Sequence, residues 1–345
     1  MINPFKFLGL AFLFMAGIYT IATYVPGEDP FSNQPSHQLV SLDGLPLPVF
    51  AELKFRHVAR QFRYDVGLFG NSRSLDIGTR HLSLGQCRFF NFSVGSESFR
   101  FTVANLERLK KIGKAPKLAL ISIDNFELQR YNNPISLFAS IRWKKAIADI
   151  MAGLTRADIG FKDFIRMGWR HVWIEVKRFE MTFNPETFYT GIVNLFSDGN
   201  YFQWVSPTAV GYHLDGSRNS PEPVKKMAFK NLLKPTSHQI KSGYFKFDLE
   251  RLARLQKYGI QVVIYESSLE PKSAAAFHKR PSSQASGSRR VFNSACAKLG
   301  LKCYVAPQGL DGDEGLWTDH SHPPAKLVGN YLNKLLSENQ LACLR

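Results

Sequence analysis

Short apolar segments with the character of β-strands alternate along this chain with segments of helical periodicity. The segment at 117–123, KLALISI, is apolar enough for a strand that is buried on both faces. The alternation predicts a parallel sheet with helices on both faces, whose ligands bind at the carboxyl ends of the strands. The predicted strands are 65–69, 89–94, 117–123, 260–265 and 302–305, and the predicted helices are 51–62, 96–112, 249–258, 291–299 and 323–337.

Two segments interrupt this alternation. Residues 127–245 form a large insertion that holds four of the five tryptophans, and the early part of the insertion has the spacing of an amphipathic helix. We expect most of these tryptophans to pack in a core, and stacking on sugar rings is the alternative. Residues 267–290 show no periodicity and are interpreted as a loop after the fourth strand.

The N-terminal segment is long enough to cross a membrane. Residues 7–25 carry no charged side chain, Lys6 precedes them, and Glu28 and Asp29 follow them. A helix of this length spans a bilayer core of ~30 Å, and the charge bias places the N-terminus in the cytoplasm. A cleaved signal peptide is the alternative, but the segment Thr20-Ile21-Ala22 matches a cleavage site poorly.

We therefore expect three parts of the chain. Residues 1–25 form an uncleaved single-pass anchor in the cytoplasmic (inner) membrane, and residues 26–50 form an extended linker. Residues 51–345 form one catalytic domain, which contains the insertion at 127–245 and lies in the periplasm or another extracytoplasmic space.

Net charge and cysteine content limit the partners and the compartment that can be expected for the protein. The formal net charge of +16 favours anionic partners such as lipid head groups, an acidic polysaccharide or nucleic acid. Nucleic acid ranks last, because no zinc-finger, RNA-binding or basic-zipper motif is present. Cys296 and Cys303 could pair in an oxidising compartment, but burial of all four cysteines as unpaired apolar residues is slightly favoured.

Two short motifs at opposite ends of the alternating pattern could carry chemistry. Ser72 follows the first strand in a Gly-Asn-Ser-Arg-Ser turn, which places its hydroxyl at the carboxyl edge of the sheet. Asp319 and His322 precede the last predicted helix, where one local turn supplies both a base and its orienting carboxylate. His320 competes as the base, and with Asp319 and His322 it could bind a metal, although no further ligand cluster supports a metal site.

Candidate oxyanion donors follow the second and third strands. The backbone N–H of Gly95 and the side-chain amide of Asn125 are expected on the same sheet edge as Ser72. Asp124 competes with Asn125 for this position, but a carboxylate there would repel the charge that develops during acyl transfer. Asn125 is therefore the expected donor.

This order of motifs resembles the SGNH hydrolase superfamily, also called GDSL-like. The likeness is closest to its membrane-anchored branch, which includes the D-alanyl transfer protein of teichoic acid modification and the alginate O-acetylation proteins. It covers residues 65–125 and 246–339. It implies an α/β fold, namely a flavodoxin-like three-layer sandwich with a mostly parallel five-stranded sheet, an N-terminal transmembrane helix and a large, mainly helical insertion.

The resemblance also implies roles for individual residues. Ser72 is the nucleophile, Asp319 and His322 complete the triad, and Gly95 and Asn125 contribute to the oxyanion hole together with the Ser72 N–H. Two motifs depart from the family pattern, because Gly-Asn-Ser replaces the usual Gly-Asp-Ser and Ser-Ile-Asp-Asn replaces the usual Gly-x-Asn-Asp.

The predicted function is serine-dependent transfer of an O-acyl group, expected to be acetyl, to or from a cell-surface polysaccharide. No cofactor or metal is expected. The resemblance implies a polytopic membrane acyltransferase as partner. A carbohydrate or lipid esterase is one alternative, and a non-catalytic scaffold or polysaccharide-binding subunit of an export or modification complex is another.

Overall fold

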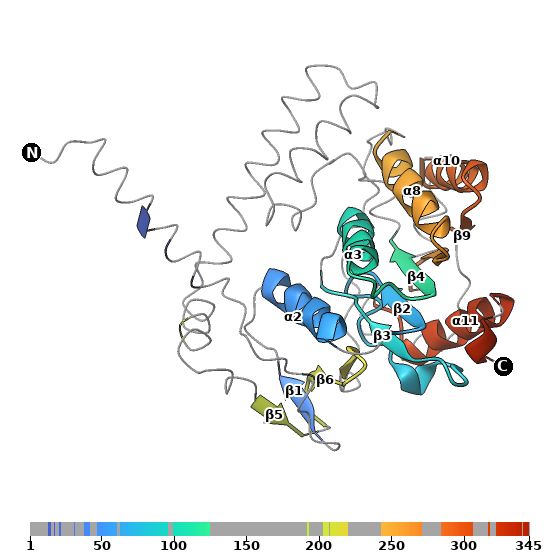
Figure 1. Ribbon diagram of the computed structural model, residues 1–345. Helices are drawn as coiled ribbons and strands as arrows, with labels where there is room; N and C mark the ends of the chain where they lie inside the picture. Colours follow the sequence, from blue (N-terminus) through green and yellow to red (C-terminus); the bar gives the residue numbers. More distant parts are fainter. Residues whose placement is uncertain are drawn as a thin grey trace, which may run out of the picture.

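The structure of the protein is a computed structural model (Figure 1). The structure describes residues 13–14, 17, 21, 31, 38–41, 47–60, 63–95, 99–124, 192, 203–206, 208–219, 243–270, 284–305, 317, 322–339 and 341–344.

A five-stranded parallel sheet forms the centre of the molecule. Its strands are β2 (Val66–Phe69), β3 (Phe89–Asn91), β4 (Leu118–Ile123), β8 (Gln261–Glu266) and β9 (Lys302–Tyr304). They lie side by side in the order β3-β2-β4-β8-β9, and every neighbouring pair is parallel. Counted along the chain this order is 2-1-3-4-5, which is the order of flavodoxin-like sheets. The predicted α/β class and the five strands are confirmed.

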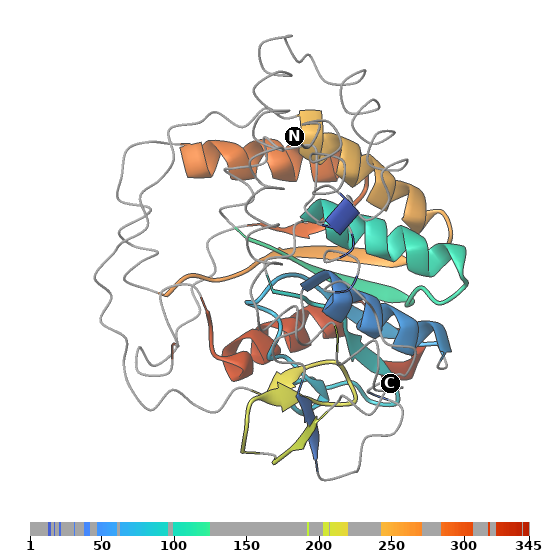
Figure 2. The ribbon, with the colours of Figure 1, turned by 90° about the vertical axis from the view of Figure 1, so that its left-hand side faces the viewer.

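Five helices pack against this sheet: α2 (Leu47–Arg60), α3 (Phe99–Lys111), α8 (Gly243–Gln256), α10 (Gln284–Lys298) and α11 (Ala325–Glu338). One buried apolar cluster joins α2, α3, α8 and α10 to one face of the sheet. A second cluster joins α11 and the segment around the short helix η1 (Thr79–His81) to the opposite face. Figure 2 shows α8 and α10 on one side of the sheet and α11 on the other.

The position of strand β4 between two layers of helices explains why its sequence is apolar without interruption. All six of its residues are buried. Ala119, Ile121 and Ile123 belong to the first apolar cluster, whereas Leu118 and Leu120 belong to the second. Successive side chains of a strand point to opposite faces, so a strand with helices on both sides has no polar face.

A small antiparallel sheet lies beside the core, near α2 (Figure 1). Its strands β1 (Leu39–Ser41), β5 (Gln203–Val205), β6 (Gly211–Tyr212) and β7 (Arg218–Asn219) follow the order β5-β1-β6-β7. Val40 of β1 lies in an apolar cluster with Leu75 and Val94, which flank the Ser72 turn and the end of β3. The small sheet therefore joins residues before the core and residues of the insertion to the loops that hold Ser72.

Several segments differ from the expected boundaries. The expected linker at 26–50 contains β1 and the first turn of α2, because prolines such as Pro48 are tolerated in a first helical turn. The loop expected at 267–290 ends earlier, since α10 begins at Gln284. Residues 203–219 of the insertion contain three short strands, and its last residues, 243–245, form the start of α8. Apart from these and residue 192, the insertion lies outside the described residues.

The expected membrane anchor at 1–25 lies largely outside the described residues. Within that segment only Leu13, Phe14, Gly17 and Ile21 are described, and they are helical. Among the residues that the structure describes, no helix combines the length and the apolar character needed to cross a bilayer.

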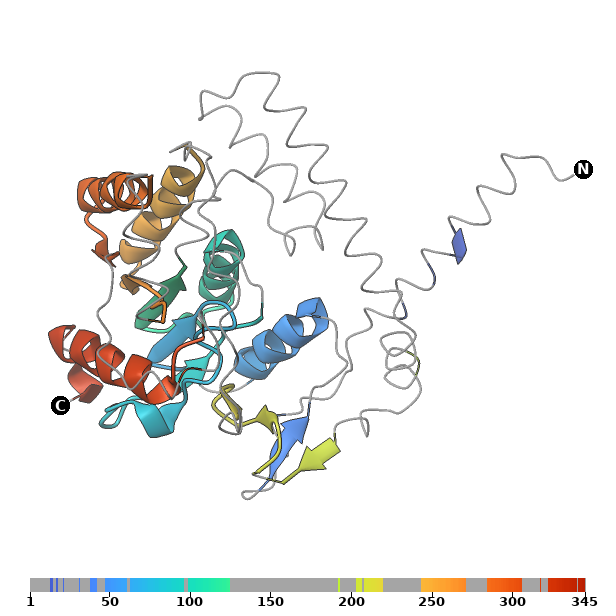
Figure 3. The ribbon, with the colours of Figure 1, turned by 180° about the vertical axis from the view of Figure 1, so that it is seen from behind.

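All four cysteines form disulfides. Cys87 bonds to Cys343 and Cys296 bonds to Cys303, with Cα atoms 4.9 and 6.2 Å apart. The expectation of four unpaired cysteines is therefore wrong, because the fold brings both pairs within the reach of a disulfide. Figure 3 shows the C-terminal residues beside the segment that leads into β3.

Candidate active site

Ser72 lies in a tight turn directly after β2. The turn begins at Gly70, where an added Cβ atom would lie 2.7 Å from the Cβ of Ser122 on the neighbouring strand β4. Only glycine fits this close approach of two strands. The N–H of Ser74 donates to the carbonyl of Asn71 at 3.1 Å, which closes the turn around Ser72.

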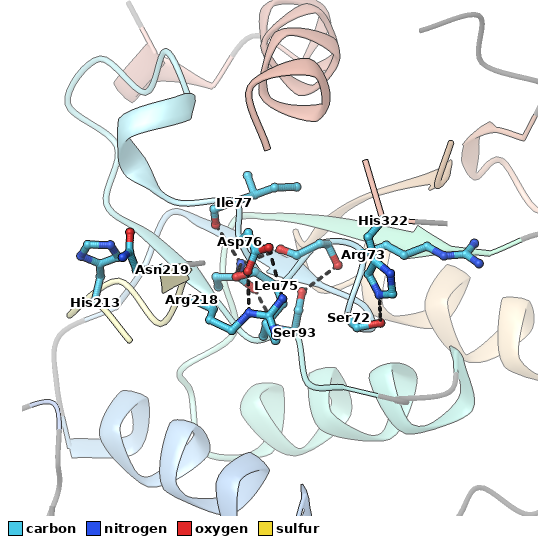
Figure 4. A network of polar contacts seen from close by, with 12 residues as sticks. Ser72, Arg73, Leu75, Asp76, Ile77, Ser93, His213, Arg218, Asn219 and His322 are labelled. Carbon is cyan, nitrogen blue, oxygen red and sulfur yellow. Dashed lines mark hydrogen bonds and ion pairs between the residues drawn. The ribbon is translucent and has the colours of Figure 1, made fainter. Parts of the chain in front are cut away.

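The imidazole of His322 faces the hydroxyl of Ser72 (Figure 4). Its Nε2 lies 2.9 Å from Ser72 Oγ, although the two residues are 250 positions apart in the chain. His322 reaches this position because it lies three residues before α11, at the carboxyl edge of the sheet where Ser72 follows β2. The distance is within the range over which a general base accepts a proton from a hydroxyl group.

Gly95, the third expected site residue that the structure describes, follows β3 on the same sheet edge. The N–H of its neighbour Val94 donates to the carbonyl of Gly70 at 3.0 Å, so the β3 loop runs alongside the Ser72 turn. Within the described part of the chain, the N–H groups of Ser72 and Gly95 donate to no acceptor. Asp319, His320 and Asn125 lie outside the described residues.

Asp124 competes with Asn125 for the expected oxyanion position, and its carboxylate is bound by the Ser72 turn. Asn71 Nδ2 donates to Asp124 Oδ2 at 2.9 Å, and Arg73 Nη1 lies 3.9 Å from the same oxygen. The three side chains are buried. A carboxylate that already accepts from an amide and lies near a guanidinium carries a partly compensated charge.

Asn91, which sequence reasoning missed, holds the chain that follows Ser72. Its Nδ2 donates to the carbonyls of Ser74, Leu75 and Ile77 at 2.8, 3.1 and 2.8 Å. Its Oδ1 accepts from the N–H of Ser93 at 2.8 Å. The only signal in the sequence is a single asparagine within the apolar run FFNFSV.

Lys54 supports the same region from α2. Its Nζ donates to the carbonyls of Asn91 and Ser93 at 2.9 and 2.7 Å, and its side chain is 1% exposed. The ammonium also lies 4.7 Å from the ring centroid of Phe50. A buried lysine with two carbonyl acceptors and an aromatic neighbour replaces the hydration that it loses.

The strands of the insertion hold the far end of the Ser72 loop. Arg218 of β7 makes a two-pronged ion pair with Asp76, with Nε–Oδ1 and Nη2–Oδ2 distances of 2.7 and 3.2 Å. Its N–H donates to the carbonyl of Leu75 at 2.8 Å. Asp215 accepts from the N–H of Thr79 at 2.7 Å. The loop that follows Ser72 is therefore held by Asn91 of β3 and by residues of the insertion.

Two histidines lie beside this contact. Arg80 donates from Nη1 to His213 Nε2, and His81 accepts through Nδ1 from the N–H of Gly78 at 3.1 Å. Burial and then the Arg80 charge lower the pKa values of His81 and His213 below their ordinary range. Burial raises the pKa of Asp215, but its hydrogen bonds from Ser217 and Thr79 outweigh that effect and lower it overall.

A further buried ion pair closes the end of β8. Arg289 of α10 donates to both carboxylate oxygens of Glu266, at 2.8 and 2.6 Å. Burial raises the pKa of Glu266, and Arg289 opposes that shift. Among the described residues, no group of three or more His, Cys, Asp or Glu side chains is arranged to hold a metal ion.

The fold and these contacts define an α/β protein with a serine–histidine pair at the carboxyl edge of a parallel sheet. No protein-family model matches the chain, and no curated protein matches it at a significant level.

Proposed function

We propose that this chain is a serine-dependent O-acyltransferase or esterase of SGNH type, with Ser72 as nucleophile and His322 as base. The observation that carries the proposal is the 2.9 Å contact between Ser72 Oγ and His322 Nε2, made between two motifs 250 residues apart. The strand order 2-1-3-4-5 supports the flavodoxin-like core that this class of enzyme would use.

The proposed reaction has two steps. Ser72 Oγ attacks the carbonyl carbon of an acyl ester while His322 takes its proton, and His322 then protonates the departing alkoxide, which leaves an acyl-Ser72 ester. A sugar hydroxyl or water next loses its proton to His322 and attacks that ester, and Ser72 departs with the proton. Asp319 would hold the imidazole in the tautomer that accepts at Nε2.

The negative oxygen of both tetrahedral intermediates needs donors on the same edge. The N–H groups of Ser72 and Gly95 support this role, because within the described part of the chain neither one donates to an acceptor. The side-chain amide of Asn125 is the third proposed donor. Removing one such donor typically slows acyl transfer ~100- to 1,000-fold.

The proposed setting is the outer side of the cytoplasmic membrane. Two disulfides support an oxidising compartment. The uncharged run at 7–25 supports an N-terminal anchor, which would hold the site near a polytopic membrane acyltransferase. The proposed substrate is a cell-surface polysaccharide that accepts or donates an O-acetyl group, and the net charge of +16 suits an acidic one.

Labelling with a fluorophosphonate probe tests the nucleophile. The purified full-length protein should be labelled at Ser72, and both Ser72→Ala and His322→Ala should abolish labelling and acyl turnover while the thermal unfolding temperature is retained. Ser337→Ala, which changes an exposed serine on α11, is the matched control and should be labelled like the wild type. Full acyl turnover in Ser72→Ala would refute the proposal.

Dependence on an acceptor separates transfer from hydrolysis. The release of the acyl group from a chromogenic acetyl ester is measured with and without a polysaccharide acceptor. A transferase should turn over many times faster with the acceptor and should yield acetylated polysaccharide. Equal rates with acetate as the product would favour a carbohydrate or lipid esterase.

A further inference from the structure

A carboxylate and an amide meet beside the nucleophile turn. Asp124 directly follows the last residue of β4, Asn71 directly precedes Ser72, and Asn71 Nδ2 donates to Asp124 Oδ2 at 2.9 Å. The two residues are 9% and 6% exposed, so water competes little for this hydrogen bond. The contact joins two neighbouring strands, β2 and β4, at the edge where Ser72 lies.

The carboxylate fixes which way the amide of Asn71 points. An ionised carboxylate only accepts hydrogen bonds, so the NH₂ group of Asn71 must face Asp124. Asn71 Oδ1 then faces the other way, where it accepts from the N–H of Arg73 at 3.1 Å. These two hydrogen bonds hold the backbone in place before and after Ser72. The N–H of Arg73 is the donor of the second bond.

The charge of Asp124 is balanced within the same cluster. Arg73 Nη1 lies 3.9 Å from Asp124 Oδ2, and both side chains are buried. The neighbouring carboxylate on β8, Glu266, has its own partner in Arg289. A balanced carboxylate at the end of β4 repels a developing oxyanion far less than an isolated one.

We infer that Asp124 is a positioning residue for the Ser72 turn and acts through the amide of Asn71, rather than facing the oxyanion itself. This inference rests on the proposed function, because the position that Asp124 controls is that of the proposed nucleophile. Two contacts carry it, one from Asn71 to Asp124 and one from the Arg73 N–H to Asn71.

Exchanging the two side chains tests the inference. Asn71→Asp places two carboxylates in contact and should slow fluorophosphonate labelling of Ser72 by about 100-fold. Asp124→Asn no longer fixes the orientation of the Asn71 amide and should slow it about 10-fold. The double variant Asn71→Asp/Asp124→Asn restores a donor–acceptor pair, because a carboxylate at position 71 accepts both from the Arg73 N–H and from an amide at position 124.

The expected result is strong coupling between the two positions. The double variant should be labelled about 10- to 100-fold faster than the product of the two single effects predicts. The single variants should lower kcat and leave the KM for an acetyl ester within about threefold of wild type, because a displaced nucleophile impairs the transition state rather than substrate binding. Single effects that simply multiply in the double variant would overturn the inference.

A matched control separates positioning from a general loss of stability. Asp65 is also a buried carboxylate next to β2, but at the opposite edge of the sheet, where Lys117 Nζ lies 3.0 Å from its Oδ1. Asp65→Asn should lower the unfolding temperature and leave the labelling rate unchanged. Failure of the proposed function has a separate signature, because wild-type Ser72 would then resist the probe. Thermal unfolding of the wild type, the two single variants and the double variant would still measure the coupling of Asn71 and Asp124. Additive changes in unfolding temperature would again overturn the inference.

Discussion

The loop that follows Ser72 depends on one buried side chain, that of Asn91. It is fully buried, and its amide donates to three backbone carbonyls between Ser74 and Ile77. The carbonyls of Ser74 and Leu75 also accept from backbone N–H groups, so the Ile77 carbonyl depends most on Asn91. An unsatisfied buried carbonyl costs about 1–3 kcal/mol.

We therefore predict that Asn91→Ala destabilises the protein by about 1–3 kcal/mol and slows labelling of Ser72. Urea unfolding gives the first value and fluorophosphonate labelling gives the second. Asn333→Ala is the control, because Asn333 of α11 also bridges backbone groups, at His81 and Ser83, but not in the Ser72 turn. Equal labelling of wild type and Asn91→Ala would show that the turn holds its shape without this amide.

Only some residues of the site could be predicted from the sequence. Ser72 and His322 could be placed together because each adjoins an element whose end falls on the same sheet edge. Asn91 and Lys54 could not, because their partners are backbone carbonyls of loops, and only the folded chain shows where those carbonyls point.

At the level of elements, the small sheet explains how part of the insertion acts on the core. Strand β7 and the turn between β6 and β7 meet the Ser72 loop and η1 through Arg218, Asp215 and His213. The central strands β4 and β8 were predictable because long apolar runs have one stable placement between layers of helices. Strands of two residues, such as β6 and β7, leave no periodic pattern to detect.

The lowered pKa values of His81 and His213 make this contact sensitive to acid. Below about pH 6.5 the unfolded chain binds protons on both histidines that the folded chain resists, so stability falls as the pH falls. We predict that the unfolding temperature decreases between pH 7.5 and pH 5.5 and that His213→Gln reduces this slope. Leu214→Gln, which adds the same side chain at an exposed neighbour, should leave the slope as in the wild type. An unchanged slope in His213→Gln would contradict the assignment.

For the whole molecule, the two disulfides constrain the chain on very different scales. Cys87–Cys343 closes a loop across a sequence separation of 256 residues, whereas Cys296–Cys303 spans only seven. The loss of chain entropy in the unfolded state grows with the logarithm of loop length, which gives about 5 kcal/mol for the first bond and about 2 kcal/mol for the second.

We predict that the paired substitution Cys87→Ser/Cys343→Ser lowers the unfolding temperature more than Cys296→Ser/Cys303→Ser does. Thermal unfolding in the absence of reductant makes the comparison. The unfolding temperature of the wild type in reductant should approach that of a variant that lacks all four cysteines. A larger loss from the Cys296–Cys303 variant would show that local packing, rather than loop length, sets the contribution of each bond.

The distance in sequence between Ser72 and His322 also has a consequence for biosynthesis. A ribosome makes the serine some 250 residues before the histidine, so the pair that faces across 2.9 Å does not exist during most of translation. A chain exported during synthesis, as the proposed setting requires, would present Ser72 outside the membrane before His322. Under the proposed function, reactivity would therefore arise only after the segment leading into α11 had emerged.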